Sequence, residues 1–485
     1  MLEYLKEEST GLDIFHYVYG VGCSVKGIGD FKGDFVVLPR SVDGVPLKAI
    51  SKFAFRGIYC IAVYIPETIG GIGEGAFQYS QSTVLYCEAK SVPDGWNENW
   101  NYSKCPVVWD CKNNDVATDG CIYTYLDGIV YSLKDGEATV FNQSYSIKDA
   151  KIPPYVPYKG RDYKVTAIKS YAFSGCNQLS RVEIPATVEK IDNGAFFNCH
   201  ALREGGVHIT SLEKWCAIDF GVNSEESNPL YHAKNLYVNG SPAVNLTIPE
   251  GVKSIKSAAF KGCTSIMEVT LPESLSYIGS TAFKNCNSLV SINIPEGVTE
   301  IGYYAFEHCK SLTIYCNGKQ IPGGWDEHWN GNDVSGRCPV VWDCKNNELA
   351  DDGSIYTIVG GLRYRINSGI ATLTAQPSLT EVADIPESIE YNGSFYKVTG
   401  MDDNAFAYLY NLKSVIIPKS ISEISGMAFY NCSALESVVL PKTIKRIGYS
   451  AFCRCTILKE IRIPKNVEIE QYAFSECDKL QVILK

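Results

Sequence analysis

Hydrophobic and polar positions along this chain repeat with a period of 22 or 23 residues. One copy begins Leu289-Val-Ser-Ile-Asn-Ile-Pro, continues through Val298 and Ile301, and contains the pair Ala305-Phe306. A fixed period of this length comes from stacked supersecondary units, each too small to bury its hydrophobic face alone. The sequence therefore predicts a repeat solenoid. The Ala-Phe pair occurs eleven times, with its phenylalanine at Phe55, Phe77, Phe173, Phe196, Phe260, Phe283, Phe306, Phe406, Phe429, Phe452 and Phe474.

Each repeat is predicted to hold a short strand and then a turn segment. In the copy above, Ile292 and Ile294 alternate with polar residues, and Pro295 ends strand pairing because it has no N–H to donate. The Ala-Phe-x-x-Cys segment has hydrophobic positions three residues apart, so we expect one turn of α- or 3₁₀-helix there. A glycine often precedes this segment, and we expect it to adopt positive φ, which glycine tolerates. Examples are Gly279, Gly302 and Gly448.

The cysteines follow the same period. Eight of the 19 lie three residues after a repeat phenylalanine, a spacing that predicts one column of stacked interior side chains. A free cysteine behaves as a small buried hydrophobe, and we favour that role over disulfide pairing. Neighbouring rungs are about 5 Å apart, so a disulfide also satisfies the distance requirement. The eight are Cys176, Cys199, Cys263, Cys286, Cys309, Cys432, Cys455 and Cys477.

Charged residues form two further columns, directly after the strand proline. Like charges stacked about 5 Å apart repel each other, so both columns must face water. The simpler interpretation is a solvated face; the alternative is a mildly basic ligand-binding face on the last run, where residues 401–485 hold 11 Lys/Arg and 9 Asp/Glu, a net charge of +2. The acidic column is Glu250, Glu273 and Glu296, and the basic column is Lys419, Lys442 and Lys465.

A second kind of module interrupts the repeats. Residues 86–143 and 315–376 are two copies that share a Trp-x-x-x-Trp pair, a Cys-Pro-Val-Val-Trp-Asp-Cys motif and a predicted β-hairpin. We interpret them as caps that close one repeat run and start the next. The tryptophans are expected in a capping core, with Trp96 and Trp325 as alternative candidates for stacking on a sugar ring.

Two other chemistries were considered for these modules. Zinc is disfavoured because Ser354 replaces Cys121 in the second copy, and neither copy has a close Cys-x-x-Cys pair. Disulfides from Cys105 to Cys111 and from Cys338 to Cys344 are more plausible, if the chain is exported.

The predicted organisation alternates between repeat runs and other segments. In chain order these are an N-terminal β cap (1–48), two repeats (49–88), a Trp-rich cap with a β-hairpin (89–162), two repeats (163–210), an insertion (211–244), three repeats (245–314), the second Trp-rich cap (315–395) and four C-terminal repeats (396–485).

Composition and sequence motifs argue against several classes of function. A net charge of -10 gives no reason to expect nucleic acid as a partner, and no stretch approaches the roughly 18 apolar residues of a membrane-spanning helix. The first residues are too acidic for a signal peptide. The six histidines share no repeat phase or metal spacing, and no nucleotide-binding or metalloprotease motif occurs. We therefore predict a protein that is not an enzyme and needs no cofactor or metal.

The repeat Leu-x-x-Val-x-Ile-Pro-x-x-Val-x-x-Ile-Gly-x-x-Ala-Phe-x-x-Cys resembles the BspA-like (Treponema pallidum-type) leucine-rich repeat, and residues 245–312 and 398–485 match it almost position by position. The resemblance implies a curved solenoid with a strand face. It also implies a surface or secreted protein, in some members an adhesin for host extracellular matrix or other microbes. The Trp-rich modules look like sequences that accompany these repeats in gut bacteria. The family brings no catalytic residues.

Three hypotheses follow. The first is a bacterial surface or secreted module that binds proteins through its solenoid face. The second is an intracellular scaffold, since no signal peptide is visible and the cysteine column favours a reducing compartment. The third is a glycan-binding protein that uses the Trp-rich modules. The oligomeric state and the ligand are not predicted.

Overall fold

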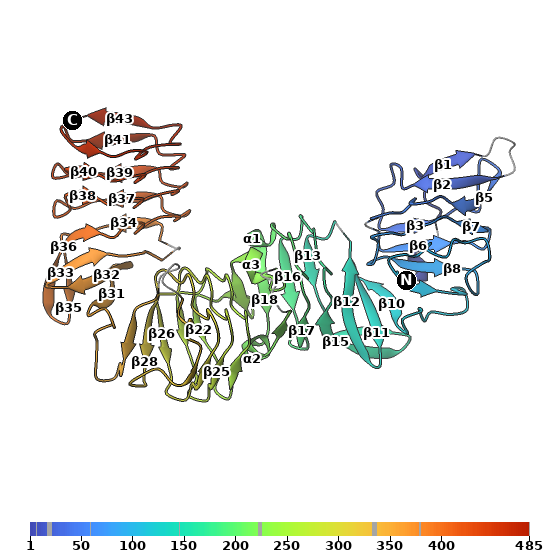
Figure 1. Ribbon diagram of the computed structural model, residues 1–485, viewed down its shortest axis with the longest axis horizontal. Helices are drawn as coiled ribbons and strands as arrows, with labels where there is room; N and C mark the ends of the chain where they lie inside the picture. Colours follow the sequence, from blue (N-terminus) through green and yellow to red (C-terminus); the bar gives the residue numbers. More distant parts are fainter. Residues whose placement is uncertain are drawn as a thin grey trace. The chain divides into compact units, whose positions relative to one another are not determined.

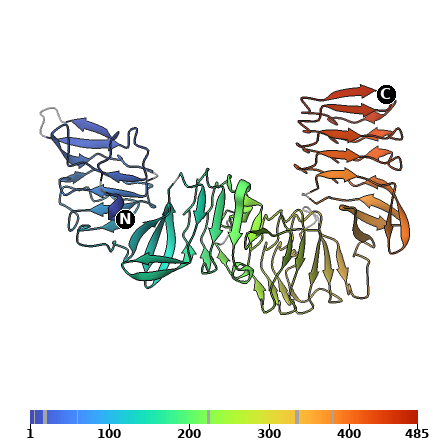
Figure 2. The same cartoon turned by 180° about the vertical axis from the view of Figure 1, so that it is seen from behind.

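A computed structural model describes residues 1–5, 7–16, 22–58, 60–144, 146–221, 226–331, 337–377 and 380–484. Parts of the predicted N-terminal cap, insertion and second Trp-rich cap lie outside these ranges, as does Lys485. The chain divides into two compact units, residues 1–233 (unit 1) and 234–485 (unit 2). Within each unit the repeats form stacked coils whose strands lie side by side, as Figures 1 and 2 show. The predicted repeat solenoid is confirmed.

Each regular repeat supplies a first strand and, after the proline, a two-residue second strand, and most of these strands pair in parallel with their equivalents in the next coil; the second strands of the lead-in segments are longer. In unit 1 the first strands are β3 (Phe35–Val37), β6 (Ala62–Ile65), β8 (Val84–Cys87) and β9 (Val107–Val108), then β13 (Asp149–Lys151), β16 (Arg181–Ile184) and β18 (Gly206–Ile209). The second strands are β2 (Cys23–Gly27), β5 (Val45–Ile50) and β7 (Gly71–Ile72), then β12 (Glu137–Gln143), β15 (Arg161–Ile168), β17 (Lys190–Ile191) and β19 (Asp219–Phe220).

Unit 2 repeats this arrangement. Its first strands are β22 (Asn245–Thr247), β24 (Glu268–Thr270), β26 (Ser291–Ile294), β28 (Thr313–Cys316) and β30 (Val340–Trp342), then β34 (Val382–Asp384), β37 (Ser414–Ile416), β39 (Ser437–Val439), β41 (Glu460–Ile463) and β43 (Gln481–Leu484). Its second strands are β23 (Ser254–Ile255), β25 (Tyr277–Ile278), β27 (Glu300–Ile301) and β29 (Gly324–Trp325), then β33 (Ile370–Leu373) with β36 (Ser394–Met401), and finally β38 (Glu423–Ile424), β40 (Arg446–Ile447) and β42 (Glu468–Ile469).

Antiparallel hairpins lead into the repeat runs. Three such lead-ins share one topology. In each, the last strand of one hairpin pairs in parallel with a long strand, and this long strand forms a second, antiparallel hairpin with the strand before it. The parallel pairs are β2 with β5, β12 with β15, and β33 with β36. Their remaining strands are β1 (Asp13–His16), β4 (Ser41–Val42), β10 (Ile122–Leu126), β11 (Ile129–Lys134), β14 (Tyr155–Tyr158), β31 (Ile355–Val359), β32 (Leu362–Asn367) and β35 (Ser388–Tyr391).

Helix is scarce in the described residues. The sequence from 202 onward holds short helices, α1 (Leu202–Gly205), α2 (Leu212–Cys216) and α3 (Leu230–Ala233), followed by the hairpin β20 (Leu236–Val238) with β21 (Ser241–Pro242). A single 3₁₀ turn, η1 (Leu2–Tyr4), lies at the start of the chain.

The Ala-Phe segments differ from the expected helical turn. Around Phe283, three N–H groups bond back within the same coil, for example Lys284 N to Thr281 O at 3.2 Å. The alternate N–H groups of Thr281, Phe283 and Asn285 bond to the next coil instead, with Phe283 N 2.8 Å from Ala305 O. Thr281 and Asn285 have positive φ (55° and 63°), which turns their N–H groups outward and prevents a continuous helix.

The positive φ values recur in all eleven repeats. The residues two before and two after each repeat phenylalanine have positive φ, and most are not glycine. The left-handed region costs a residue with a Cβ about 1–2 kcal/mol, so the hydrogen bonds between coils must hold these residues in place.

The prediction for the repeat glycines is wrong. Gly279, Gly302 and Gly448 do not have positive φ. Each donates its N–H at 2.8 Å to an isoleucine carbonyl of the preceding coil. A Cβ built on Gly302 would lie 2.5 Å from Ser280 N, closer than real Cβ contacts. Glycine therefore permits a close backbone approach between these coils.

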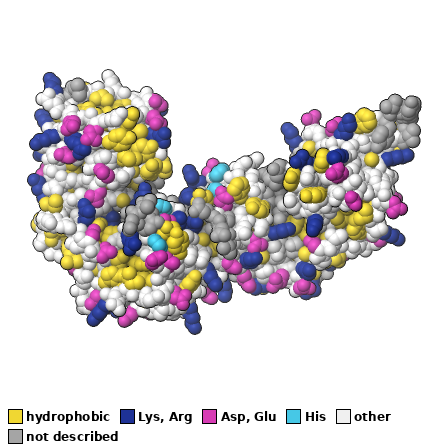
Figure 3. All heavy atoms as spheres, viewed as in Figure 1, with side chains coloured by type: hydrophobic (Ala, Val, Ile, Leu, Met, Phe, Trp, Pro, Cys, Tyr) yellow, Lys and Arg dark blue, Asp and Glu magenta, His cyan; other side chains and the backbone are white. Residues whose placement is uncertain are grey.

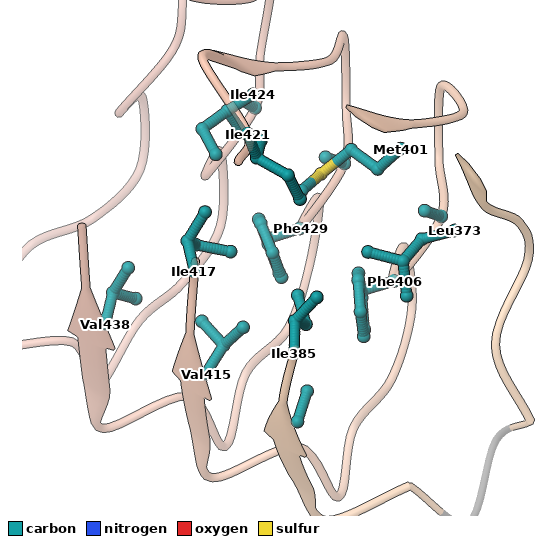
Figure 4. Close-up of a cluster of buried hydrophobic side chains, with 14 of the residues drawn as sticks. Leu373, Ile385, Met401, Phe406, Val415, Ile417, Ile421, Ile424, Phe429 and Val438 are labelled. Carbon is teal, nitrogen blue, oxygen red and sulfur yellow. The ribbon is translucent and has the colours of Figure 1, made fainter. Parts of the chain in front are cut away.

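The core of each unit is a stack of identical side chains. Phe406 and Phe429 lie face to face with ring centroids 4.9 Å apart, packed against strand residues such as Val415 and Ile417, as Figure 4 shows. The other six neighbouring pairs of repeat phenylalanines are also stacked, at 5.0–5.5 Å. These rings fill the space between the turn segments and the strands.

The predicted cysteine column lies in this core, and it is more than apolar filling. Its members are at most 2% exposed, apart from the half-buried Cys477, and all 19 cysteines of the chain are free thiols. In every repeat after the first of a run, the side chain donates to the carbonyl of the preceding repeat phenylalanine. Examples are Cys432 Sγ to Phe406 O at 3.0 Å and Ser80 Oγ to Phe55 O at 2.8 Å.

This contact fits the two repeats in which an aliphatic residue replaces cysteine, although Cys176 and Cys263 also stand in first repeats, where they contact Gln143 and Ser265 instead. Ile58 and Leu409 occupy the cysteine position in the first repeats of their runs, where no preceding repeat phenylalanine offers a carbonyl. Ser80 supplies a hydroxyl in place of the thiol.

We predict that Gly302→Ala destabilises unit 2 by about 1–3 kcal/mol, because the added methyl group must push the coil of Ser280 away. Gly318→Ala is the control, since its Cβ would meet nothing closer than 3.8 Å. Urea unfolding of both variants measures the difference, and equal losses would show that coil spacing adjusts freely.

We predict that Cys432→Ala lowers the free energy of unfolding more than Cys432→Ser does. The alanine removes the thiol donor and leaves the Phe406 carbonyl with only the Leu409 N–H at 3.3 Å, at a cost of about 0.5–1.5 kcal/mol, whereas the serine keeps a side-chain donor as Ser80 does. Chemical unfolding of both variants tests this. A serine variant less stable than the alanine variant would show that the column is purely hydrophobic.

Candidate functional site

The tryptophan candidates are core residues. Trp96 and Trp325 are 7% and 9% exposed, and their indole N–H groups donate to Ile69 O at 3.1 Å and Val298 O at 3.0 Å. Each packs edge-on against a second tryptophan, Trp100 or Trp329, with ring centroids 4.7 Å apart. This burial favours the capping-core interpretation and leaves little ring surface for a sugar.

Each Trp-rich module begins as a further coil of the solenoid. Trp100 takes the place of the repeat alanine, because its carbonyl accepts the N–H of Phe77 at 3.4 Å, and Trp329 accepts from Phe306 at 3.2 Å. Cys105 enters the cysteine column by donating to Ser80 O at 3.0 Å. The two disulfides considered from the sequence are therefore absent from this structure, where all four of their cysteines are free.

The basic column is exposed, as its repeat phase predicted. Lys419, Lys442 and Lys465 all face solvent, and Lys419 lies 3.9 Å from Glu387. The acidic column is exposed as well. Figure 3 shows lysine and arginine side chains along one edge of the C-terminal stack and hydrophobic side chains on the surface that it presents. The exposure of these lysines fits the solvated-face interpretation.

A different surface of the last run gathers aromatic side chains. We call it the aromatic turn face, and it consists of Tyr408, Tyr410, Tyr430, Tyr449, Tyr472 and Arg454, all within or beside the Ala-Phe turn segments. Four of the five tyrosines are 40–56% exposed and Tyr430 is half-buried.

Four of these tyrosines are held in pairs. Tyr408 packs on Tyr430 of the next coil at 5.3 Å, and Tyr449 packs on Tyr472 at 5.7 Å, both edge to face. The Arg454 guanidinium lies 5.9 Å from the Tyr430 ring. The backbone at Tyr408 and Tyr472 has positive φ, and at Tyr408 a hydrogen bond from its N–H to Tyr430 O of the next coil fixes this conformation.

Sequence analysis missed this face because its tyrosines do not share one repeat phase. They occupy several positions around the repeat phenylalanine, and only the stacking of coils brings them together, Tyr408 with Tyr430 and Tyr449 with Tyr472. The available signal was tyrosine content, since 31 of 485 residues are tyrosine.

Burial raises the pKa of Cys176 and Cys432 to about 12, so these column thiols stay protonated at neutral pH. Cys477, at the end of the column, differs because a hydrogen bond with Cys455 lowers its pKa. No group of three or more metal-ligating side chains occurs in the part of the chain that the structure describes. Among the same residues, no helix is long and apolar enough to cross a membrane.

One buried carboxylate has a structural role. Burial by itself raises the pKa of Glu88, but hydrogen bonds from Lys112, Tyr64, the Glu67 N–H and Arg40 outweigh that effect and lower it to about 2. Glu88 lies 2.5 Å from Arg40 and 2.7 Å from Lys112. A carboxylate held ionised by so many donors ties neighbouring coils together and has no proton to exchange near neutral pH.

Comparisons with known proteins agree with the repeat geometry. Residues 42–92, 137–216, 233–321 and 387–484, more than half of the chain, match the BspA type leucine rich repeat region in six copies. No curated protein sequence matches the chain significantly.

Several solved structures are similar. A leucine rich cell surface protein from Faecalibacterium prausnitzii is 25% identical, covering 74% of this chain and 88% of that chain with a TM-score of 0.30. A leucine-rich repeat protein from Bacteroides capillosus is 33% identical, covering 27% of this chain and 98% of that one with a TM-score of 0.25. One from Bacteroides ovatus is 24% identical, covering 75% and 89% with a TM-score of 0.26. On the evidence of its repeats, the chain belongs to the BspA type leucine rich repeat family.

Proposed function

We propose that this protein is a non-enzymatic binding module of a bacterial surface or secreted protein, and that it holds a protein partner on its aromatic turn face. The observation that carries the proposal is the set of exposed, paired tyrosines on the last repeat run. Protein interfaces are enriched in tyrosine and arginine and depleted in lysine, which favours this face over the basic column.

The physical advantage of the turn face is rigidity. A tyrosine has few rotatable bonds, and its partner ring in the next coil restricts it further, so little side-chain entropy is lost on binding. The phenol group adds a hydrogen-bonding end to a large apolar ring. The lysines of the basic column must lose more side-chain freedom to form a contact.

We predict that the double variant Tyr410→Ala/Tyr449→Ala loses binding to a protein partner by about tenfold or more. Neither residue has positive φ, so the substitutions do not disturb the strained turn positions. The probes are immobilised fibronectin, laminin and collagen, measured by biolayer interferometry, with thermal melting as the folding check.

The control for that experiment is Lys442→Ser/Lys465→Ser, which removes charge from the basic column and leaves the tyrosines in place. Binding that falls in the lysine variant and survives in the tyrosine variant would move the site to the basic column. A wild-type chain that binds none of these proteins but does bind a glycan array would favour the glycan hypothesis.

We also predict that the protein is reached from outside the cell. Mild protease treatment of intact cells of the source organism should release its peptides, while peptides of an abundant cytoplasmic protein, the matched control, stay absent from the supernatant. Recovery only after lysis would support the alternative of an intracellular scaffold.

A further inference from the structure

A cavity of about 280 Å³ lies on the strand face of unit 2, away from the aromatic turn face. It forms where the hairpin of β31 and β32 stands against the outer side of β24, β26 and β28. Ser291, Thr313 and Tyr315 line it from the strands, and Tyr356 and Arg363 line it from the hairpin. The repeat pattern does not require a cavity here.

Arg363 is unusual among the residues that line the cavity. It is only 3% exposed, yet its hydrogen bonds go to neutral acceptors: Thr374 Oγ1 and Thr313 Oγ1, both at 2.8 Å, and Leu312 O at 3.3 Å. The Tyr356 ring lies 4.6 Å from the guanidinium. Within the described residues no ion pair joins Arg363 to a carboxylate, since Asp402 pairs with Arg365 instead. Buried charges are normally neutralised by a partner of opposite charge.

The first Trp-rich module provides an internal comparison. Where unit 2 has Arg363, Thr313 and Thr374, unit 1 has Val130, Val84 and Phe141, all buried in one apolar cluster. Three hydrophobic residues are thus replaced together by one arginine and the two hydroxyls that accept its hydrogen bonds. The strands that face the hairpin differ between the units as well. In the strand register, Phe35 and Ala62 of unit 1 occupy the positions of Glu268 and Ser291 of unit 2.

Unit 1 also shows what this place on the fold accommodates. The segment Met1–Leu5 packs there, with Met1 and Leu5 buried in the same cluster as Val84 and Val130. The Tyr4 ring stacks on Phe35 at 5.5 Å and meets Tyr125 of the hairpin at 4.9 Å. A short peptide segment of about the length of Met1–Leu5 therefore fits between the strand face and the hairpin.

We propose that the cavity of unit 2 binds a short peptide segment of another protein and that Arg363 recognises a carboxylate on that segment. The geometry of unit 1 supports a peptide as the occupant, and Arg363 can take an anion because its own hydrogen bonds go to neutral acceptors while Asp402, the nearby carboxylate, pairs with Arg365. Glu268 is exposed at the rim and repels additional negative charge, so the site suits one carboxylate rather than a polyanion. The proposal does not depend on the aromatic turn face.

The test is a peptide-phage selection on the full chain, with counter-selection on Arg363→Val/Thr313→Val/Thr374→Phe. This variant carries the residues of the first module and should fold, because replacing a buried charge by well-packed hydrophobic residues is usually neutral or stabilising. Arg363→Gln is a second variant that removes the charge but keeps a hydrogen-bond donor near Thr313. Thermal melting confirms that both are folded.

Selected peptides are then synthesised with each Asp or Glu in turn replaced by its amide. We expect one carboxylate whose loss weakens binding about tenfold to a hundredfold, with a similar loss in both Arg363 variants. Tyr410→Ala/Tyr449→Ala, the control on the other face, should bind these peptides as the wild type does.

Three results would overturn the proposal. The first is a selection that yields no peptide whose binding depends on Arg363. The second is a set of selected peptides whose amide forms bind as well as the carboxylate forms. The third is Arg363-dependent binding of tetragalacturonate when no peptide binds. A failure here leaves the matrix-protein measurements on the turn face unaffected, so the two proposals are tested separately.

Discussion

The hydrogen bonds between the turn segments of neighbouring coils are the constraint on which the rest of the structure depends. Phe283 N bonds to Ala305 O, and the residues two positions to either side donate in the same direction. These bonds hold residues with bulky side chains at positive φ, a conformation that none of them would adopt alone. They also fix the distance between coils, and so determine how the phenylalanine rings stack and how near the glycines approach the preceding backbone.

The same constraint separates the interior of the solenoid from its surface. The N–H groups of the turn that do not bond within their own coil find their partners in an adjacent coil, and the cysteine thiols add to these bonds by donating to the phenylalanine carbonyls. Because the frame is held by backbone and core, the outward side chains are free to vary. Tyrosines on the last run and the arginine under the second hairpin are two such variations, each placed by coils that have the same interior.

The duplicated modules show how one framework supports different surfaces. Both begin as a coil in which tryptophan replaces the repeat alanine, and both continue as a three-stranded antiparallel meander. In unit 1 the start of the chain packs into the apolar part of this space, beside a cavity of about 360 Å³ that Tyr86, Tyr123 and Tyr158 line; in unit 2 the cavity is about 280 Å³ and Arg363 lines it. A change of a few residues thus converts an apolar cluster into a polar wall without altering strand register.

The period of the sequence by itself determined the solenoid, the strand phases, the buried cysteine column and the exposure of Lys419, Lys442 and Lys465, because side chains at one phase must share one environment. It did not reveal positive φ at Thr281 or Tyr408, the close approach at Gly302, or the tyrosine cluster. Those features arise from contacts between coils, and neither intrinsic propensity nor spacing along one coil contains information about its neighbour. Only the tertiary structure decided which coil carbonyl each N–H meets, and therefore which side chains come together on the surface.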